Sequence, residues 1–136
     1  MNRMEEKIVI LSKAESISEV EKYIEEICSK YNVDDAIFGN ILVSITEAVN
    51  NAIIHGNKND LSKFVSVSHK IKEDQKLLSI TVTDEGKGFN YNNLPDPTSP
   101  ENISMIGGRG VFLIKNLADY VIFSDKGNSI ELDFRI

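Results

Sequence analysis

The chain has 136 residues, of which 41% are hydrophobic and 26% are charged, and 15 basic against 21 acidic side chains give a net charge of −6. A length of this order fits one globular domain, so residues 1–136 are expected to form a single domain. The acidic balance argues against a general nucleic-acid binder, because such proteins present basic faces to phosphates.

Cysteine content and hydropathy bear on metal binding and on cellular location. Cys28 is the only cysteine, which excludes an internal disulfide and, with only two histidines, argues against a zinc site. No unbroken apolar run approaches the ~20 residues that cross a bilayer, and the first residues lack the apolar centre of a signal peptide. We therefore expect a cytoplasmic protein without a membrane-spanning segment.

A strand and a helix are expected first. Residues 7–11 are typical of a strand, and Ser16-x-x-Glu19 matches a capping box, which satisfies free N–H groups at the start of a helix. Behind it, apolar residues recur at three- and four-residue spacing, which indicates an amphipathic helix. These residues are Ile17, Val20, Ile24, Ile27, Cys28 and Tyr31.

A second helix is expected from Asp34 or Asp35, either of which can cap it, to about His55, where Gly56 and Asn57 stop it. One arc of this helix is apolar and is predicted to pack on a sheet. It comprises Ile37, Phe38, Ile41, Ile45, Val49 and Ala52. Val43 and Ile54 lie elsewhere on the helix and are also apolar, so we expect the helix to be covered on much of its circumference.

The rest of the chain is predicted to be rich in strands. The expected elements are a strand at 64–71, a hairpin turn at 73–76, a strand at 78–83, a long loop at 90–106, a short helix at 110–118 and strands at 120–124 and 129–136. Several strands are joined by hairpins rather than by helices. The fold class is therefore α+β: a two-layer α/β sandwich with a mixed, mostly antiparallel sheet and helices on one face.

Polar residues form a stripe on the second helix. At 100° per residue, Ser44, Glu47, Asn51 and His55 fall within one narrow arc. The Asn51 carbonyl oxygen is a hard ligand suited to Mg²⁺, and Glu47 can position or deprotonate a nucleophile. Alternatively, these groups bond to neighbouring backbone or to the loop at 90–106, and His55 alone is more typical of a structural residue at a helix end.

Asp84 follows the strand at 78–83 and has the same parity as Val82, so its carboxylate is predicted to point into the apolar interior. It can accept a hydrogen bond from a ligand amino group such as that of adenine. Gly86 and Gly88 allow positive φ and let a flat base approach the main chain. The alternative is a buried aspartate that is bonded to the backbone of its own turn.

A second glycine cluster, Gly107-Gly108-Arg109-Gly110, precedes an apolar run that starts at Val111. Free N–H groups at a helix start attract anions, and Arg109 can add a charge-assisted contact to phosphate. The alternative is a flexible loop end with a surface arginine. The chain contains neither a P-loop nor a Gly-x-Gly-x-x-Gly that joins a strand to a helix, which argues against those nucleotide sites.

Together, the stretch 47–57, the Asp84-x-Gly86-x-Gly88 motif and the second glycine cluster resemble the N box and the two glycine boxes of Bergerat-fold, histidine kinase-like ATPases. Within that superfamily, the sequence Asn-Asn-Ala-Ile-Ile-His-Gly at 50–56 is most similar to anti-sigma factor serine/threonine kinases. The resemblance implies ATP bound with Mg²⁺ between helices and sheet.

Position by position, the resemblance implies that Asn51 ligates Mg²⁺ and that Glu47 is the catalytic base. Asp84 would hold the adenine amino group, with His55, Gly86 and Gly88 as further nucleotide-binding residues, and Gly108, Arg109 and Gly110 would receive phosphates. The implied partners are a sigma factor, an anti-anti-sigma protein of the STAS type and a second copy in a homodimer. Neither nucleic acid nor membrane is an expected direct partner.

Two other functions remain open from the sequence. One is an ATP-gated binding module that sequesters a sigma factor or another regulator without chemistry. The other is a detached ATP-binding domain of a histidine kinase, which the placement of both histidines, His55 in the N box and His69 on a strand, disfavours. Anti-sigma factor kinases of bacterial sporulation switches usually carry a basic residue just ahead of the second glycine box, where this chain has Met105 and Ile106. That departure concerns the partner and the transfer more than nucleotide binding.

Overall fold

The computed structural model describes residues 6–86, 108–124 and 128–136. The helices and strands are β1 (Glu6–Leu11), α1 (Ile17–Lys30), α2 (Asp35–Asn51), β2 (Phe64–Lys72), β3 (Leu77–Thr83), α3 (Gly108–Leu117), β4 (Tyr120–Phe123) and β5 (Ser129–Arg135). Helix α2 runs directly into a π-helical turn, Ala52–Gly56. All the expected helices and strands are present to within a few residues, whereas the predicted loop at 90–106 lies outside the described residues.

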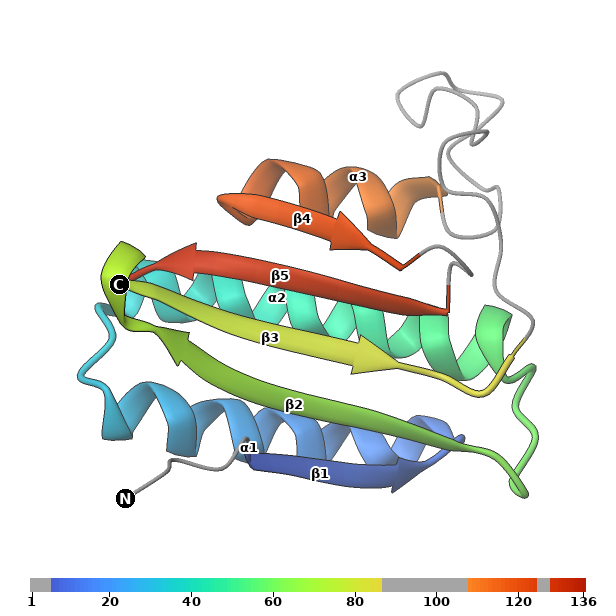
Figure 1. Ribbon diagram of the computed structural model, residues 1–136. Helices are drawn as coiled ribbons and strands as arrows, with labels where there is room; N and C mark the ends of the chain where they lie inside the picture. The colour runs from blue at the N-terminus through green and yellow to red at the C-terminus, as the bar shows by residue number, and fades with distance from the viewer. Residues whose placement is uncertain (1–5, 87–107, 125–127) are drawn as a thin grey trace.

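The five strands form one sheet in the order β1-β2-β3-β5-β4. Every pairing between them is antiparallel. All three helices lie on the same face of this sheet, as Figure 1 shows. The predicted two-layer α+β sandwich is therefore confirmed, and the described strands contain no parallel pairing.

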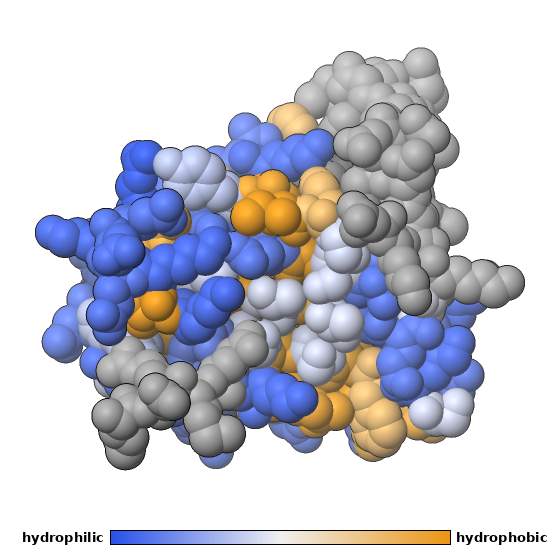
Figure 2. Space-filling model, in the orientation of Figure 1, coloured by the Kyte–Doolittle hydropathy of each residue, from blue (hydrophilic) through white to orange (hydrophobic). Residues whose placement is uncertain are grey.

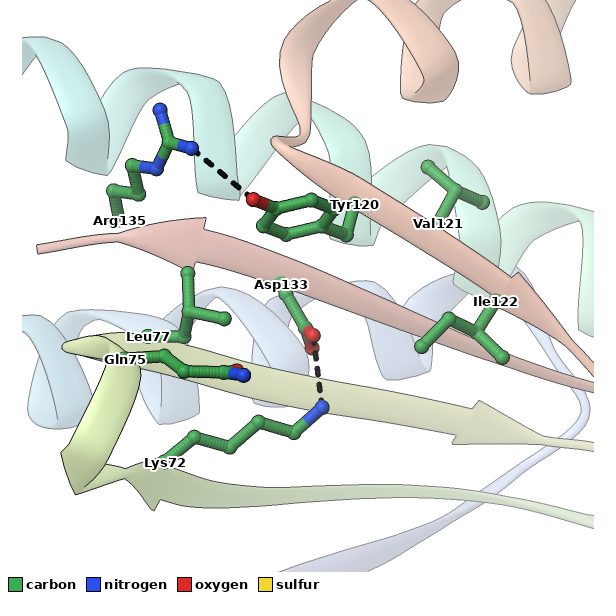
Figure 3. Close-up of a pocket in the computed structure, with 8 residues that line it drawn as sticks. All are labelled: Lys72, Gln75, Leu77, Tyr120, Val121, Ile122, Asp133 and Arg135. Atoms are coloured by element: carbon green, nitrogen blue, oxygen red, sulfur yellow. Dashed lines mark hydrogen bonds and ion pairs between the residues drawn. The ribbon is translucent and has the colours of Figure 1, made fainter.

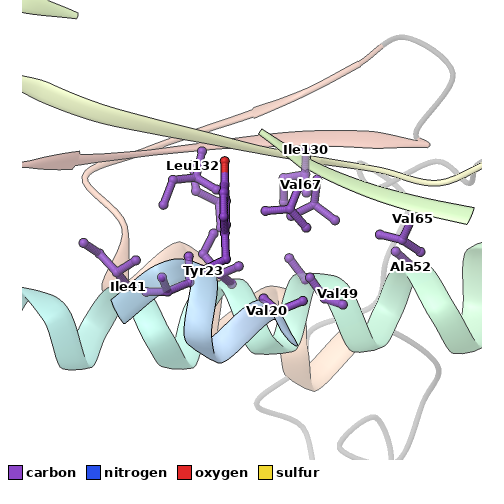
Figure 4. Close-up of a cluster of buried hydrophobic side chains, with 14 of the residues drawn as sticks. Val20, Tyr23, Ile41, Val49, Ala52, Val65, Val67, Ile130 and Leu132 are labelled. Atoms are coloured by element: carbon purple, nitrogen blue, oxygen red, sulfur yellow. The ribbon is translucent and has the colours of Figure 1, made fainter. Parts of the chain in front are cut away.

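The core lies between the helices and the inner face of the sheet (Figure 4). Strand alternation places Ile80 and Val82 of β3 on that face, and the same spacing holds for Ile130, Leu132 and Phe134 of β5. From the helices, the buried apolar residues include Val20, Ile24, Ile27, Cys28, Ile41, Ile45, Val49 and Ala52. The apolar faces predicted for α1 and α2 are thus confirmed as part of the core.

Two local expectations were wrong. Neither Ser16 at the start of α1 nor Asp34 at the start of α2 makes a side-chain capping hydrogen bond. Ser16 is instead the last residue of a 3-10 turn, Ala14–Ser16, whose αR backbone geometry continues into α1. Val43 and Ile54 are 44% and 45% exposed, so α2 is not covered around most of its circumference by the described part of the chain.

By length and composition alone, the continuous helix Asp35–Gly56 could cross a membrane, although the sequence contains no unbroken apolar run of that length. This is weak support for a membrane span, because a core helix of a soluble protein passes the same test. Here Ile41, Ile45 and Val49 are fully buried in the core. The apolar composition of the helix is therefore explained by its packing against the sheet.

Candidate nucleotide site

Asp84 stands at the end of β3 and points inward, as its parity with Val82 predicts. It is only 7% exposed, and its Oδ1 accepts a hydrogen bond from the Gly86 N–H at 2.8 Å. Burial raises the pKa of the Asp84 carboxyl, against smaller opposing effects of the Gly86 N–H and the charge of Lys63. Asp84 makes no ion pair with any residue in the described ranges.

Gly56 and Gly86 leave space for the Asp84 carboxylate because they have no side chain. A Cβ at Gly56 would collide with the Asp84 carboxylate, and one at Gly86 would collide with the Gly56 carbonyl oxygen. Gly86 does not use the positive φ that glycine allows. Gly86 is required because the turn after β3 lies directly against the end of the helix, and the predicted role of Gly88 falls outside the described residues.

The helix end itself is irregular. The backbone N–H of Asn57 donates to the Ala52 carbonyl at 2.8 Å, a bond across five residues that defines the π turn. The arc that His55 would share with Glu47 and Asn51 on a continuous α-helix therefore ends at Asn51. His55 is half-buried, and burial lowers its pKa.

Glu47 and Asn51 lie one turn apart on α2, about 6 Å along its axis. Both side chains are half-buried, and neither hydrogen-bonds to any residue in the described part of the chain. Ser44, the third member of the stripe, is fully buried and donates to the Asn40 carbonyl at 2.7 Å, a bond within its own helix. Ser44 therefore has a local role, which distinguishes it from Glu47 and Asn51.

The second glycine cluster opens helix α3, which starts at Gly108. Helices α2 and α3 pack together, and α3 begins at the end of the molecule where α2 finishes (Figure 1). The N–H groups of the first turn of α3, which have no acceptor within the helix, are thus at the same end as Asp84 and the π turn. Gly107 and the Arg109 side chain lie outside what the structure describes.

Sequence reasoning overlooked Asn57, which it treated only as a stop signal. The side chain is 1% exposed, and its Oδ1 accepts the Glu85 N–H at 2.8 Å. Its Nδ2 donates to Ser12 Oγ at 2.9 Å and to the Phe64 carbonyl at 3.0 Å. An asparagine directly after the helix-ending Gly56 was the available signal, because a buried amide there needs partners from other segments.

A cavity of about 520 Å³ lies elsewhere, on the outer face of the sheet. Figure 2 shows this face, and Figure 3 shows the side chains that line the cavity, including Lys72, Tyr120, Asp133 and Arg135. Lys72 Nζ donates to Glu131 at 2.6 Å and to Asp133 at 2.9 Å. Arg135 Nη2 donates to Tyr120 Oη at 3.1 Å, whereas Asp133 Oδ1 has no hydrogen-bond partner among the described residues. The cavity lies on the opposite face of the sheet from Asp84 and is a distinct feature.

Residues 10–134 match the family described as the histidine kinase-like ATPase domain. The chain is 27% identical over 139 residues to the serine-protein kinase RsbW of Listeria monocytogenes serovar 1/2a, covering 96% of this chain and 87% of that protein. It is 32% identical over 95 residues to the serine-protein kinase RsbW of Bacillus cereus strain AH187, covering 65% and 58% of the two chains.

A solved structure has the same fold. The crystal structure of the RsbU and RsbW domains of a Mycobacterium tuberculosis protein aligns with a TM-score of 0.68 and 17% identity, covering 98% of this chain. This chain spans 32% of that longer chain, so the likeness concerns one part of it.

Proposed function

Because this chain belongs to the family of histidine kinase-like ATPase domains, we propose that it is a single-domain, Mg²⁺-dependent ATP-binding protein serine/threonine kinase. In the proposed role it acts as an anti-sigma regulatory factor, which binds a sigma factor and phosphorylates an anti-anti-sigma protein of the STAS type. The serine-protein kinase names of its relatives support the reaction.

One observation carries the ATP-binding part of this proposal. Asp84 is a buried carboxylate that has a backbone N–H as its hydrogen-bond donor and no ion pair in the described residues. A buried charge in that state is costly, and such perturbed groups cluster at functional sites. The adenine amino group is a donor that would complete its hydrogen bonding.

The phosphate end would be formed by α2 and α3. Asn51 would hold the Mg²⁺ that accompanies ATP, and the first turn of α3, with Gly108, Arg109 and Gly110, would receive phosphates. The described residues contain no cluster of three or more metal-ligating side chains. A single protein oxygen from Asn51, together with the ATP phosphates, fits Mg²⁺, which is commonly bound by one or two protein oxygens together with substrate phosphates and water.

The transfer would depend on positioning and charge stabilisation. The oxygen of a partner serine or threonine attacks the γ-phosphorus, the bond from that phosphorus to the β–γ bridging oxygen breaks, and ADP leaves. Glu47 takes the proton of the attacking hydroxyl. When bound, Mg²⁺ offsets negative charge that develops on the phosphate oxygens.

The test combines binding with transfer. The purified chain is titrated with ATP in a calorimeter and then incubated with γ-labelled ATP and STAS-domain proteins from the same organism. We expect label on a STAS protein, and we expect Glu47→Gln to lose at least about 10²-fold in transfer rate while its ATP affinity stays within about threefold.

Three outcomes would contradict the proposal in whole or in part. No heat with ATP would reject the nucleotide site. Tight ATP binding without label on any STAS partner would reject the kinase reaction and favour the alternative, an ATP-gated module that sequesters a regulator. Retained transfer in Glu47→Gln would remove Glu47 from the mechanism.

A further inference from the structure

Asn57 joins three segments that are distant in the sequence. Both hydrogens of its amide and its carbonyl oxygen are used, by Ser12 Oγ, the Phe64 carbonyl and the Glu85 N–H, at 2.9, 3.0 and 2.8 Å. Ser12 Oγ in turn donates to the Lys63 carbonyl at 2.6 Å. The end of α2 is thereby tied to the end of β1, the start of β2 and the turn after β3.

A second asparagine holds the other side of that turn. The Asp84 N–H donates to the Asn128 carbonyl at 2.9 Å, and Asn128 Nδ2 donates to the Asp84 carbonyl at 3.1 Å. Asn128 thus holds the N–H of Asp84 and the C=O of the Asp84–Glu85 peptide group, and Asn57 holds the N–H of that same peptide group. The direction of the Asp84 carboxylate depends on both.

Side-chain packing cannot replace the contact from Asn57. Where the helix end meets the turn, the facing residues are Gly56 and Gly86, and neither has room for a Cβ. Among the described residues, the Asn57 amide provides the side-chain hydrogen bond that joins the helix end to the turn. This bond therefore helps to fix the separation of Asp84 from the helix.

We infer that Asn57 is a positioning residue, which fixes the Asp84 carboxylate and so sets how strongly the site prefers a purine that carries a 6-amino group. The inference rests on the proposed function, in which Asp84 accepts a hydrogen bond from adenine. Such a bond depends steeply on alignment, so a turn released from the helix would lose discrimination as well as affinity. A purely structural role for Asn57 would lower affinity for every nucleotide alike.

The experiment compares ATP with purine riboside 5′-triphosphate, which lacks the 6-amino group, by calorimetry well below the melting temperature of each variant. We expect the wild-type chain to prefer ATP by about 10- to 100-fold, as one hydrogen bond to a charged acceptor implies. Asp84→Asn should reduce this preference to within about threefold, and Asn57→Ser should reduce it at least about fivefold.

Ser12→Ala is the matched control, because it removes one partner of the Asn57 amide and leaves the contact with Glu85 intact. We expect it to lower the melting temperature while the preference for ATP stays within about twofold of wild type. If Asn57→Ser keeps the wild-type preference while Asp84→Asn loses it, the inference is overturned and the proposed function stands. If the wild-type chain binds neither nucleotide, the proposed function fails and the inference falls with it.

A measurement on the wild-type chain decides the matter if Asn57→Ser does not fold. The Glu85 amide hydrogen is the one that Asn57 accepts, and its exchange with solvent reports on that bond. At saturating nucleotide, ATP should slow its exchange at least about fivefold more than the analogue does, because only ATP engages Asp84 through an amino group. Equal protection by both nucleotides would overturn the inference.

Discussion

Two buried aspartates of this chain have opposite surroundings. Asp133, on the outer face of the sheet, is 2% exposed and is paired with Lys72 at 2.9 Å. Asp84, on the inner face, is 7% exposed, and within the described part of the chain it accepts from a backbone N–H and forms no ion pair. Although burial opposes it, the hydrogen bond from Lys72 helps to hold the pKa of Asp133 below its ordinary value, whereas burial raises the pKa of Asp84.

The difference in surroundings indicates a structural role for Asp133 and a binding role for Asp84. The charge of Asp133 is compensated by its own lysine, although its Oδ1 has no hydrogen-bond partner among the described residues. A buried carboxylate that is left with a backbone donor, in a space kept open by Gly56 and Gly86, is costly to the fold. The second arrangement is the one expected of a binding site, where stability is given up for recognition.

The largest expected effect is on ATP affinity, when each aspartate in turn is replaced by asparagine. Asp84→Asn should weaken ATP binding by about 10- to 100-fold, because an amide aligned as a donor or a weaker acceptor replaces the charged acceptor. Asp133→Asn should leave ATP affinity within about twofold, since Asp133 and its partner Lys72 lie on the outer face. Calorimetric titration of both variants measures this, and an equal loss in the two would refute the distinction.

Removing the cation tests the structural aspartate. Lys72→Met leaves Asp133 buried without its partner and should lower the free energy of unfolding by about 2 kcal/mol, less than for a fully buried pair because the Lys72 side chain is 29% exposed. Lys70→Met on the same strand is the control. It has no ion pair within the described ranges, and we expect a change within about 0.5 kcal/mol by urea denaturation. Equal stability of the two variants would contradict the assignment.

The sequence predicted Asp84 far better than Asp133. Asp84 follows a strand with period-two alternation, so its parity with Val82 was enough to place its carboxylate inside. The pairing of Lys72 with Asp133 depends on the register of β2, β3 and β5, where Lys72 lies opposite Leu77 and Ser79 lies opposite Asp133. Register between distant strands is a tertiary property, which a single strand's pattern does not contain.

The same limit explains Asn57 and the helix starts. The Asn57 amide bonds to segments up to 45 residues away, so no local pattern could identify its partners. The capping signals at Ser16 and Asp34 were read correctly as helix starts, but backbone geometry decided against the side-chain bonds. Periodicity, which is local, located helices α1 and α2 and strands β2, β3 and β5.

Adding a methyl group at two glycines tests whether the space beside Asp84 is specific. Gly56→Ala places a Cβ against the Asp84 carboxylate and should lower stability by about 1–3 kcal/mol. Gly39, within α2, has no atom near its Cβ position, so Gly39→Ala should raise stability by about 0.5–1 kcal/mol through helix propensity. Thermal melts of both variants check the opposite signs, and a stabilised Gly56→Ala chain would show that the space is not needed.

The smallest effect concerns pH, where the two aspartates should differ in sign. A carboxyl whose pKa is raised on folding favours the folded state below its ordinary pKa, and that contribution is lost as pH rises through the raised value. Charged Asp84 therefore lowers stability at neutral pH, and Asp84→Asn should raise the melting temperature of the nucleotide-free chain by about 1–3 °C at pH 7, with the gain shrinking toward pH 4.

For Asp133 the lowered pKa reverses the argument: its charged form contributes stability above the ordinary pKa, and this is lost as pH falls through the lowered value. Asp133→Asn should therefore melt below wild type at pH 7, and the deficit should narrow in acid. Melting curves of both variants between about pH 4 and pH 8 give the two signs directly. If both substitutions destabilise the chain at pH 7, the raised pKa of Asp84 has another origin than an uncompensated buried charge, and its role as a carboxylate kept for a ligand loses its physical basis.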